Sequence, residues 1–279
     1  MTTDPNHEPA AHRVAIVTGA GAGVGRATAC RLGREGVAVV AADIRLDAAR
    51  ETAQLVEAAG GTALGHRTDV SDEGEVAAMV AAAVATFGRL DYLHNNAAAL
   101  GPDGYGSDWA IHDLDLAVWN KTLGVNTTGA FLGIKHAVPA MRDAGGGSIV
   151  STVSVAAFEG GFDHAAYGVS KAAIVNLTQY AASMYGADLI RCNAVAPGLI
   201  LSETALAALD ERDLAMFAAE CSLPWSADPE DIAAVVVWLL GDESRCVTGQ
   251  TITVDSGMMA RRPQDSMIAW EQYLKGDLS

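Results

Sequence analysis

The sequence is poor in positive charge and in long apolar runs. Its 279 residues include 18 Lys and Arg against 34 Asp and Glu, which gives a formal net charge of −16. A surface this acidic repels phosphate backbones and anionic lipid head groups, and no run of Lys or Arg reverses the sign locally. We therefore expect no nucleic acid and no membrane surface among its partners.

Cysteine is also scarce, and the four cysteines are far apart with no C-x-x-C spacing. This distribution favours reduced thiols over disulfides or a zinc site, so no metal centre is predicted. Residues 1–12 lack the apolar core of a secretory signal and are predicted to be a flexible tail. No apolar run reaches the length of a membrane span. These absences together predict a cytoplasmic protein.

Half of the residues are apolar, yet only 6% are aromatic, and alanine, valine and glycine are abundant. Short β-branched runs alternate with helix-period segments, which predicts βαβ units. The predicted strands are 13–18, 37–43, 63–68, 90–95, 147–153, 189–195 and 251–254, and the predicted helices are 23–35, 46–59, 72–87, 116–143, 167–185 and 229–240. This order predicts an α/β fold: a Rossmann-type, doubly wound parallel sheet of about seven strands with helices on both faces. Residues 13–259 are expected to form one domain.

The first predicted strand runs into a glycine-rich turn, Thr18–Gly25 (TGAGAGVG), and then into a helix. Glycines at this junction let backbone amides approach a pyrophosphate, which the positive end of the helix dipole also attracts. The alternative is an ordinary tight turn, which the order of strand, turn and helix disfavours. The turn is therefore predicted to bind a dinucleotide.

Asp43 closes the second predicted strand. A carboxylate there can accept hydrogen bonds from the ribose hydroxyls of adenosine and would repel a 2′-phosphate. Arg45 lies two residues later and could instead pair with a 2′-phosphate, and a turn or helix-cap role for Asp43 is the other alternative. With no basic residue inside the glycine turn, NAD is predicted over NADP.

Tyr167 and Lys171 are four residues apart in a helix-like run, so both side chains lie on one helix face. A neighbouring ammonium stabilises a phenolate, which predicts a lowered pKa for Tyr167. A phenol tuned in this way can exchange a proton with a carbonyl or alcohol oxygen. Ser154, after the fifth predicted strand, could hold the same oxygen.

Taken together, these motifs resemble the short-chain dehydrogenase/reductase family over about residues 12–258. The matching residues are Thr18–Gly25, Asp69-Val70, Asn95–Ala98 (NNAA), Asn126, Ser154, Tyr167, Lys171 and Pro197-Gly198. The resemblance implies four catalytic residues: Asn126, Ser154, Tyr167 and Lys171. In that arrangement Lys171 also binds the nicotinamide ribose, and Asn126 holds a water that links Lys171 to solvent.

The resemblance also implies a set of contacts to the cofactor. These are Gly19, Gly21, Ala22, Gly23, Val24, Gly25, Asp43, Asp69, Val70, Asn96, Tyr167, Lys171, Pro197, Gly198, Ile200 and Ser202. Three positions depart from the family pattern: Ala98 replaces a glycine, Ser202 replaces a threonine, and Asp255-Ser256-Gly257 replaces Asp-Gly-Gly. Either Ser202 or Thr204 could therefore meet the nicotinamide carboxamide.

Residues 199–226 correspond to the family's substrate lid and carry apolar side chains, although a surface helix packed on the body is an equal alternative. The tail, residues 260–279, has an apolar stripe at helical spacing that fits a subunit contact, in keeping with a homo-oligomer, tetramer or dimer. We expect an NAD-dependent dehydrogenase of an apolar, cyclic or steroid-like secondary alcohol. The alternatives are a 3-oxoacyl-thioester reductase, which Asp43 and the acidic surface disfavour, and a non-catalytic NAD(H) sensor.

Overall fold

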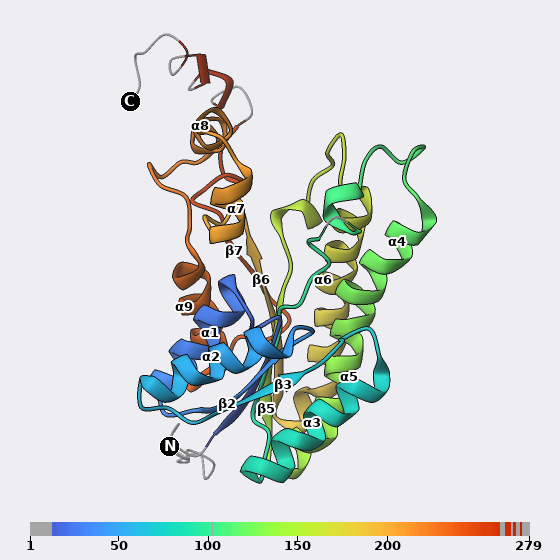
Figure 1. Ribbon diagram of the computed structural model, residues 1–279, viewed down its shortest axis with the longest axis vertical. Coiled ribbons are helices and arrows are strands. Elements are labelled where there is room, and N and C mark those ends of the chain that lie inside the picture. The colour runs from blue at the N-terminus through green and yellow to red at the C-terminus, as the bar shows by residue number, and fades with distance from the viewer. Residues whose placement is uncertain (1–12, 102, 263–265, 269, 272–273, 275–279) are drawn as a thin grey trace.

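The computed structural model of the protein describes residues 13–101, 103–262, 266–268, 270–271 and 274. Seven parallel strands form one sheet in the order β3-β2-β1-β4-β5-β6-β7 (Figure 1). The strands are β1 (Val14–Thr18), β2 (Ala38–Asp43), β3 (Ala63–Arg67), β4 (Tyr92–Asn95), β5 (Gly147–Thr152), β6 (Ile190–Pro197) and β7 (Thr251–Val254). The predicted Rossmann-type sheet is therefore confirmed. Its strand order reverses between β1 and β4, which is the place where such sheets bind ligands.

Helices cover both faces of the sheet (Figure 1). On one face, α1 (Gly23–Arg34), α2 (Leu46–Ala58) and α9 (Pro229–Leu240) pack in one apolar core with β1 and β2. On the other face, α3 (Glu73–Phe87), α5 (Gly129–Asp143) and α6 (Ala165–Tyr185) form a second core. Because both faces are buried, the central strands read as continuous apolar runs in the sequence.

Local signals explain where several helices begin and end. The Asp72 carboxylate accepts a hydrogen bond from the Glu75 amide at 2.9 Å and caps α3, while Gly88 ends that helix with a φ of 85°. Asp228 and Asp231 form a reciprocal capping box at the start of α9, beside Pro229. These are the residue types that favour each position.

The predicted helix 116–143 is the main difference between expectation and structure. It consists of α4 (Leu116–Leu123), a π-helical turn (Gly124–Thr128) and α5. The backbone stays helical through the turn, so apolar periodicity alone could not detect the extra residue. Two further helices, α7 (Glu203–Ala208) and α8 (Glu211–Glu220), lie within the predicted lid segment, for which a surface helix was the alternative.

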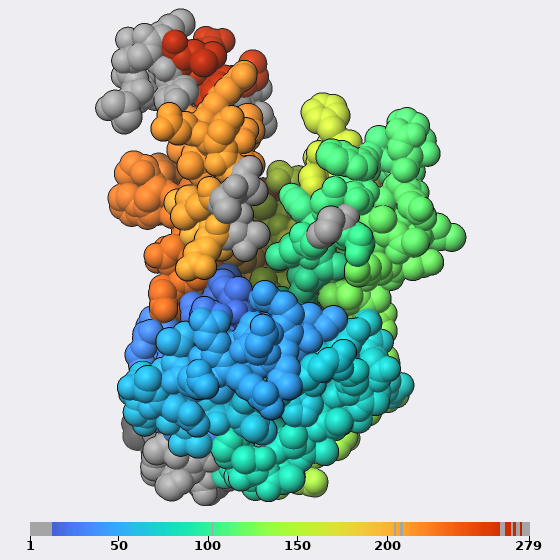
Figure 2. All heavy atoms as spheres, in the orientation of Figure 1, coloured from blue at the N-terminus to red at the C-terminus, as the bar shows by residue number. Residues whose placement is uncertain are grey.

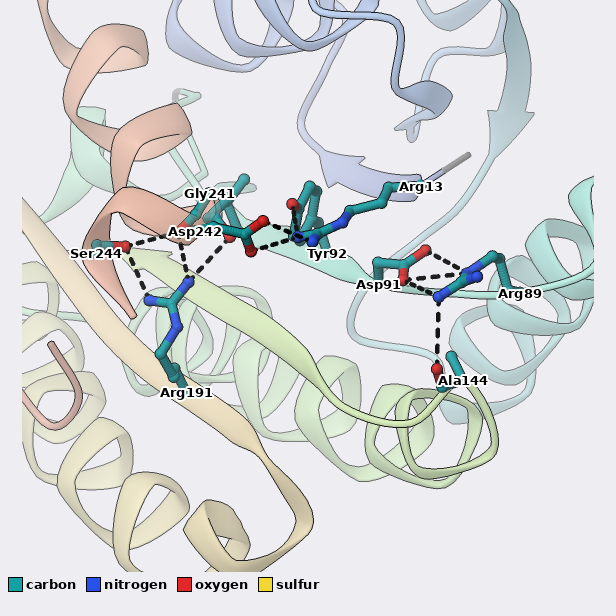
Figure 3. Close-up of polar contacts among 10 residues, drawn as sticks. Arg13, Arg89, Asp91, Tyr92, Ala144, Arg191, Gly241, Asp242 and Ser244 are labelled. Atoms are coloured by element: carbon teal, nitrogen blue, oxygen red, sulfur yellow. Dashed lines mark hydrogen bonds and ion pairs between the residues drawn. The ribbon is translucent and has the colours of Figure 1, made fainter. Parts of the chain in front are cut away.

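A cavity of about 460 Å³ lies at the amino ends of the strands, away from the switch point. Figure 3 shows that three arginines lining it, Arg13, Arg89 and Arg191, are bound to the protein itself. Arg191 donates to the carbonyls of Leu239 and Gly241 at 2.7 and 2.9 Å, and Arg13 pairs with Asp242 at 2.8 Å. These bonds tie β6 and β1 to the end of α9, so we interpret this region as structural.

Three further findings concern the described part of the chain. All four cysteines are free thiols. The described residues contain no cluster of three His, Cys, Asp or Glu side chains that could hold a metal ion. In the same ranges, no helix combines the length and apolar character needed to cross a membrane. The tail from 260 is only partly described, and residues 1–12 fall outside the described ranges.

Candidate active site

The carboxyl ends of β1, β4, β5 and β6 open into a cleft. Figure 2 shows this hollow between the segment around residues 200–226, in orange, and the connection from β4 to α4 with the 155–163 loop, in green and yellow. The α7–α8 segment thus forms one wall. Leu206, Met216 and Trp225 in it are 51%, 41% and 60% exposed, whereas Leu209 and Phe217 are partly buried. Whether this wall closes as a lid stays a prediction.

The glycine turn lies between β1 and α1, as predicted. Gly19 has a φ of 63°, and a Cβ on Gly25 would approach the Gly19 carbonyl oxygen to 2.2 Å, so no side chain fits there. Ala22 occupies the N-cap position of α1 and provides no capping side chain. The first amides of α1, those of Gly23 and Val24, therefore have no side-chain cap and fit an anion such as a pyrophosphate.

Two side chains that the sequence analysis did not single out donate hydrogen bonds to main-chain carbonyls of this turn. Arg26 donates to the Gly21 carbonyl at 2.6 Å and pairs with Glu51 at 2.8 Å. Thr52 donates to the Ala20 carbonyl at 2.8 Å. An arginine and a threonine in ordinary helical sequence carry no signal of this role, because the contacts are made only in the fold.

Asp43 lies at the carboxyl end of β2 beside the glycine turn. One carboxylate oxygen accepts the Gly21 amide at 2.9 Å, and the other accepts the Arg45 amide at 3.0 Å. A Cβ on Gly21 would lie 2.7 Å from the first oxygen, which explains the glycine. The Arg45 guanidinium is 3.8 Å from Asp43 and 63% exposed. The carboxylate is thus fixed at the edge of the turn where an adenosine ribose is predicted.

The remaining predicted cofactor contacts lie along the same edge. Asp69 and Val70 follow β3, and Val70 is 7% exposed in the core. The Asn96 amide group donates to the Thr18 carbonyl at 3.1 Å and so joins the ends of β4 and β1. The last four residues stand at or after the end of β6: Pro197 and Gly198 beside β7, Ile200 bridged to Ala227, and Ser202 at the N-cap of α7.

Ser202 accepts the Ala205 amide at 3.2 Å and is therefore engaged as a helix cap. The side chain of Thr204 lies outside the described atoms, so the choice between the two hydroxyls stays open.

Tyr167, Ser154 and Lys171 come together at the end of β5. The Ser154 hydroxyl is close enough to the Tyr167 phenol to lower its pKa. Lys171 is 2% exposed, and its ammonium lies 5.5 Å from the centre of the Tyr167 ring. That ammonium donates to the Thr152 carbonyl at 2.8 Å. The predicted sharing of one helix face is thus what the structure shows.

The predicted direction of the Tyr167 pKa is wrong for the free protein. Burial raises the pKa of Tyr167 to about 12, Tyr105 adds to the rise, and the Ser154 hydroxyl lowers it only in part. Burial also lowers the pKa of Lys171 to about 8. Desolvation disfavours the charged form of both groups, and it outweighs the attraction that helical spacing suggested.

Asn126 is the only predicted catalytic residue that lies in the π-helical turn, and it is 2% exposed. Its side-chain oxygen accepts the Ala99 amide at 2.8 Å, and its amide group donates to the Ser170 hydroxyl at 2.9 Å. Ser170 in turn donates to the Tyr167 carbonyl at 2.7 Å. A cavity of about 10 Å³, lined by Asn126, Thr152 and Thr18 among others, adjoins it. This is about the room that one water needs.

His94, in β4, is fully buried behind the site, with its Nε2 2.8 Å from the Thr152 hydroxyl. Its Nδ1 is buried without a hydrogen-bond partner among the described residues. Burial, with a smaller effect of the Lys171 charge, lowers the pKa of His94 to about 3. Thr152 links this histidine to Lys171: its hydroxyl is hydrogen-bonded to His94, and its carbonyl oxygen accepts a hydrogen bond from the Lys171 ammonium.

This histidine leads to a stability prediction. Between its native pKa and an unfolded value of about 6.5, only the unfolded chain binds the proton, so the free energy of unfolding falls as the pH falls. Through His94 the parent protein should therefore lose up to about 2 kcal/mol of stability between about pH 7 and 5. In His94→Val this part of the loss should be absent. Urea unfolding of both proteins at the two pH values measures this. An unchanged pH dependence in the variant would show that the pKa of His94 is the same in the folded and the unfolded protein.

The comparisons with known proteins identify the family of the chain. The family model described as enoyl-(acyl carrier protein) reductase matches residues 19–259. A probable short-chain type dehydrogenase/reductase of Bradyrhizobium diazoefficiens is 42% identical, over 90% of this chain and 89% of its own. Cis-4-hydroxycyclohexanecarboxylate dehydrogenase of Sinomonas cyclohexanicum is 40% identical, over 91% of this chain and 99% of its own.

A solved structure extends the likeness to three dimensions. The 7α-hydroxysteroid dehydrogenase complexed with NADH and 7-oxo glycochenodeoxycholic acid superposes with a TM-score of 0.83 at 30% identity, over 88% of this chain and 93% of its own. The fold is thus shared with relatives that match nearly the whole chain. The chain belongs to the short-chain dehydrogenase/reductase family and is an oxidoreductase of secondary alcohols and ketones that uses a nicotinamide cofactor.

Proposed function

We propose that the protein is an NAD-dependent dehydrogenase of apolar, alicyclic secondary alcohols, with Tyr167 as its acid/base. The observation that carries the proposal is the Tyr167 phenol, next to Ser154 and on one helix face with Lys171, at the carboxyl end of β5. Asp43, on the far side of the switch point, supports NAD over NADP because its carboxylate would repel a 2′-phosphate.

The residues divide the proton chemistry among them. The nicotinamide supplies the hydride acceptor or donor when it is bound. Ser154 orients the substrate oxygen, and Tyr167 gives that oxygen a proton or takes one from it. Lys171, anchored at the Thr152 carbonyl, stabilises the phenolate once charge develops. Asn126 and the small cavity beside it offer a place for a water that passes the proton on toward solvent.

Apolar side chains around the cleft support the substrate class. Leu100, Trp109 and Phe158, on the wall opposite α7 and α8, are 61%, 59% and 47% exposed. Exposed apolar groups grouped about a cleft are typical of a binding site for an apolar molecule. The named relatives act on a hydroxycyclohexane acid and a hydroxysteroid, which are ring-shaped secondary alcohols.

The direct test is turnover of a panel of alcohols with NAD or NADP, followed by NADH absorbance. We expect activity on substituted cyclohexanols or hydroxysteroids with NAD, and little on short linear alcohols. Turnover of 3-oxoacyl thioesters with NADPH would instead favour a 3-oxoacyl-thioester reductase, and turnover of enoyl thioesters would favour the activity for which the matching family model is named. Binding of NADH without turnover of any compound would favour a sensor.

The direction of the reaction should depend on pH in a defined way. Because the pKa of Tyr167 is raised to about 12, the phenol of the free protein is protonated near neutral pH. A protonated phenol donates to a ketone, whereas alcohol oxidation needs the phenolate, so kcat/KM for oxidation should rise up to about tenfold per unit between about pH 7 and 10. Reduction should stay nearly level over the lower part of this range. Initial rates in both directions across it test the prediction, and oxidation that falls with pH would contradict it.

A further inference from the structure

The first turn of helix α6, which carries Tyr167, has no cap of its own. Its N-cap residue, His164, has a φ of 60° and makes no capping hydrogen bond with its side chain. The amides of Ala166 and Tyr167 donate instead to the carboxylate of Asp108, at 3.1 and 2.7 Å. The His164 amide also donates to the main-chain oxygen of Asp108, at 2.7 Å. One distant residue thus takes three hydrogen bonds from the start of this helix.

Asp108 lies in the connection from β4 to α4, 59 residues before Tyr167, and is 1% exposed. A buried carboxylate is costly unless it is paired. Here two amides and the positive end of a 21-residue helix provide the pairing. The bond is therefore mutual: the helix start neutralises Asp108, and Asp108 fixes the backbone of the residue that bears the phenol.

The same connection also contacts the Tyr167 ring. The Tyr105 ring stacks on the His164 imidazole with centroids 3.7 Å apart, and it meets the Tyr167 ring edge-on at 5.0 Å. The Asp108 amide donates to the Tyr105 carbonyl at 3.3 Å, so the two residues share a turn. Tyr167 is thus held at its backbone by Asp108 and along one side of its ring by Tyr105.

We propose that Asp108 is a positioning residue for Tyr167: by capping α6 from a distant loop, it sets where the phenol stands relative to Ser154. The inference rests on the proposed role of Tyr167 as acid/base. The proposal separates proton transfer from cofactor binding. The glycine turn and Asp43 are predicted to bind the cofactor. They lie in and beside the β1–α1 junction and do not touch Asp108. Loss of the cap should therefore impair proton transfer and spare cofactor binding.

The test compares three variants: Asp108→Ala, Asp108→Asn and Asp228→Ala. Asp228 is the matched control, since its carboxylate also accepts two amides at a helix start, those of Glu230 and Asp231 at 2.8 and 3.0 Å. Its helix, α9, carries none of the proposed site residues. For each variant, kcat is expressed per NADH-binding site, counted by fluorescence titration, so that a loss of folded protein does not count as a loss of rate.

Asp108→Ala should lower kcat about 10- to 100-fold, because a displacement of about 1 Å at a reacting group costs this much. The dissociation constant of NADH should change far less than kcat, because the glycine turn and Asp43 are untouched and only Tyr167 and Lys171 of the predicted cofactor contacts lie on α6. Asp108→Asn keeps one acceptor oxygen and the side-chain shape, so it should recover most of the rate. Asp228→Ala should lower the melting temperature and leave kcat per site unchanged.

Two results would overturn the inference. One is a kcat per site of Asp108→Ala equal to that of the parent protein. The other is an equal fall in kcat for Asp108→Ala and Asp228→Ala, which would mean that any lost cap has this effect. Failure of the proposed function looks different: in that case Tyr167→Phe itself keeps its activity, whatever the Asp108 variants do.

Discussion

Replacing Tyr167 by phenylalanine is expected to lower kcat by about 10²- to 10⁴-fold, the range that a positioned acid/base contributes. The change removes one hydroxyl and keeps the ring. The ring contacts with Tyr105 and Lys171 should therefore survive, and so should the backbone bond to Asp108. The variant loses the hydroxyl that exchanges a proton with the substrate oxygen, which Ser154 orients. The effect should thus fall on kcat and only slightly on cofactor affinity.

The matched control is Tyr180→Phe. Tyr180 lies on the same helix, α6, but its side chain is 58% exposed and belongs to no part of the proposed site. Steady-state rates with the best alcohol from the panel, together with NADH titration, measure both variants. Tyr180→Phe should match the parent protein in kcat and in NADH affinity. Comparable loss in the two variants would point to damage to α6 and would leave Tyr167 without a special role.

A Tyr167→Phe variant with most of its activity would also be informative. The Ser154 hydroxyl would then have to exchange the proton without a phenol beside it. Because the pKa of Tyr167 is raised to about 12 in the free protein, such a result would mean that the phenol stays inert during turnover. The pH profile would then lose its alkaline rise as well.

The fold was predictable because its signals are local. The seven strands were found within two residues at each end, since apolar β-branched runs mark buried parallel strands. The helix caps at Asp72 and Asp228 are likewise readable from adjacent residues. The π-helical turn at Asn126 was missed because these local signals do not report it. It changes the spacing of one turn inside a continuous helix, and the apolar pattern on either side stays helical.

The site was predictable only where its residues are close in sequence. Tyr167 and Lys171 share a face because four residues make about one helical turn. The partners that hold them come from other elements: Thr152 from the end of β5 binds Lys171, and Asp108 from the β4–α4 connection binds the Tyr167 amide. No sequence spacing reports these contacts. The direction of the Tyr167 pKa failed likewise, because burial is a property of the fold.

The second large effect is expected at Asp43, in the choice between the two nicotinamide cofactors. Asp43→Ser should lower kcat/KM with NAD about 10- to 100-fold, because a carboxylate that accepts the ribose hydroxyls is replaced by a single neutral hydroxyl. The same change removes a negative charge from the place where a 2′-phosphate would lie. It also releases Arg45, whose guanidinium is 3.8 Å from Asp43. Activity with NADP should therefore rise, and the preference should shift by about 10³-fold or more.

The control for this prediction is Asp47→Ser, a change of the same kind in the first turn of α2. Asp47 is exposed and makes none of the contacts that Asp43 makes with Gly21 and Arg45. It should leave both kcat/KM values unchanged, which separates a local contact from the general loss of one negative charge on an acidic surface. The outcome also tests the geometry of the turn. If Asp43→Ser weakens NAD and NADP equally, then the main task of Asp43 is to hold the Gly21 amide, and the discrimination between the cofactors must come from elsewhere in the cleft.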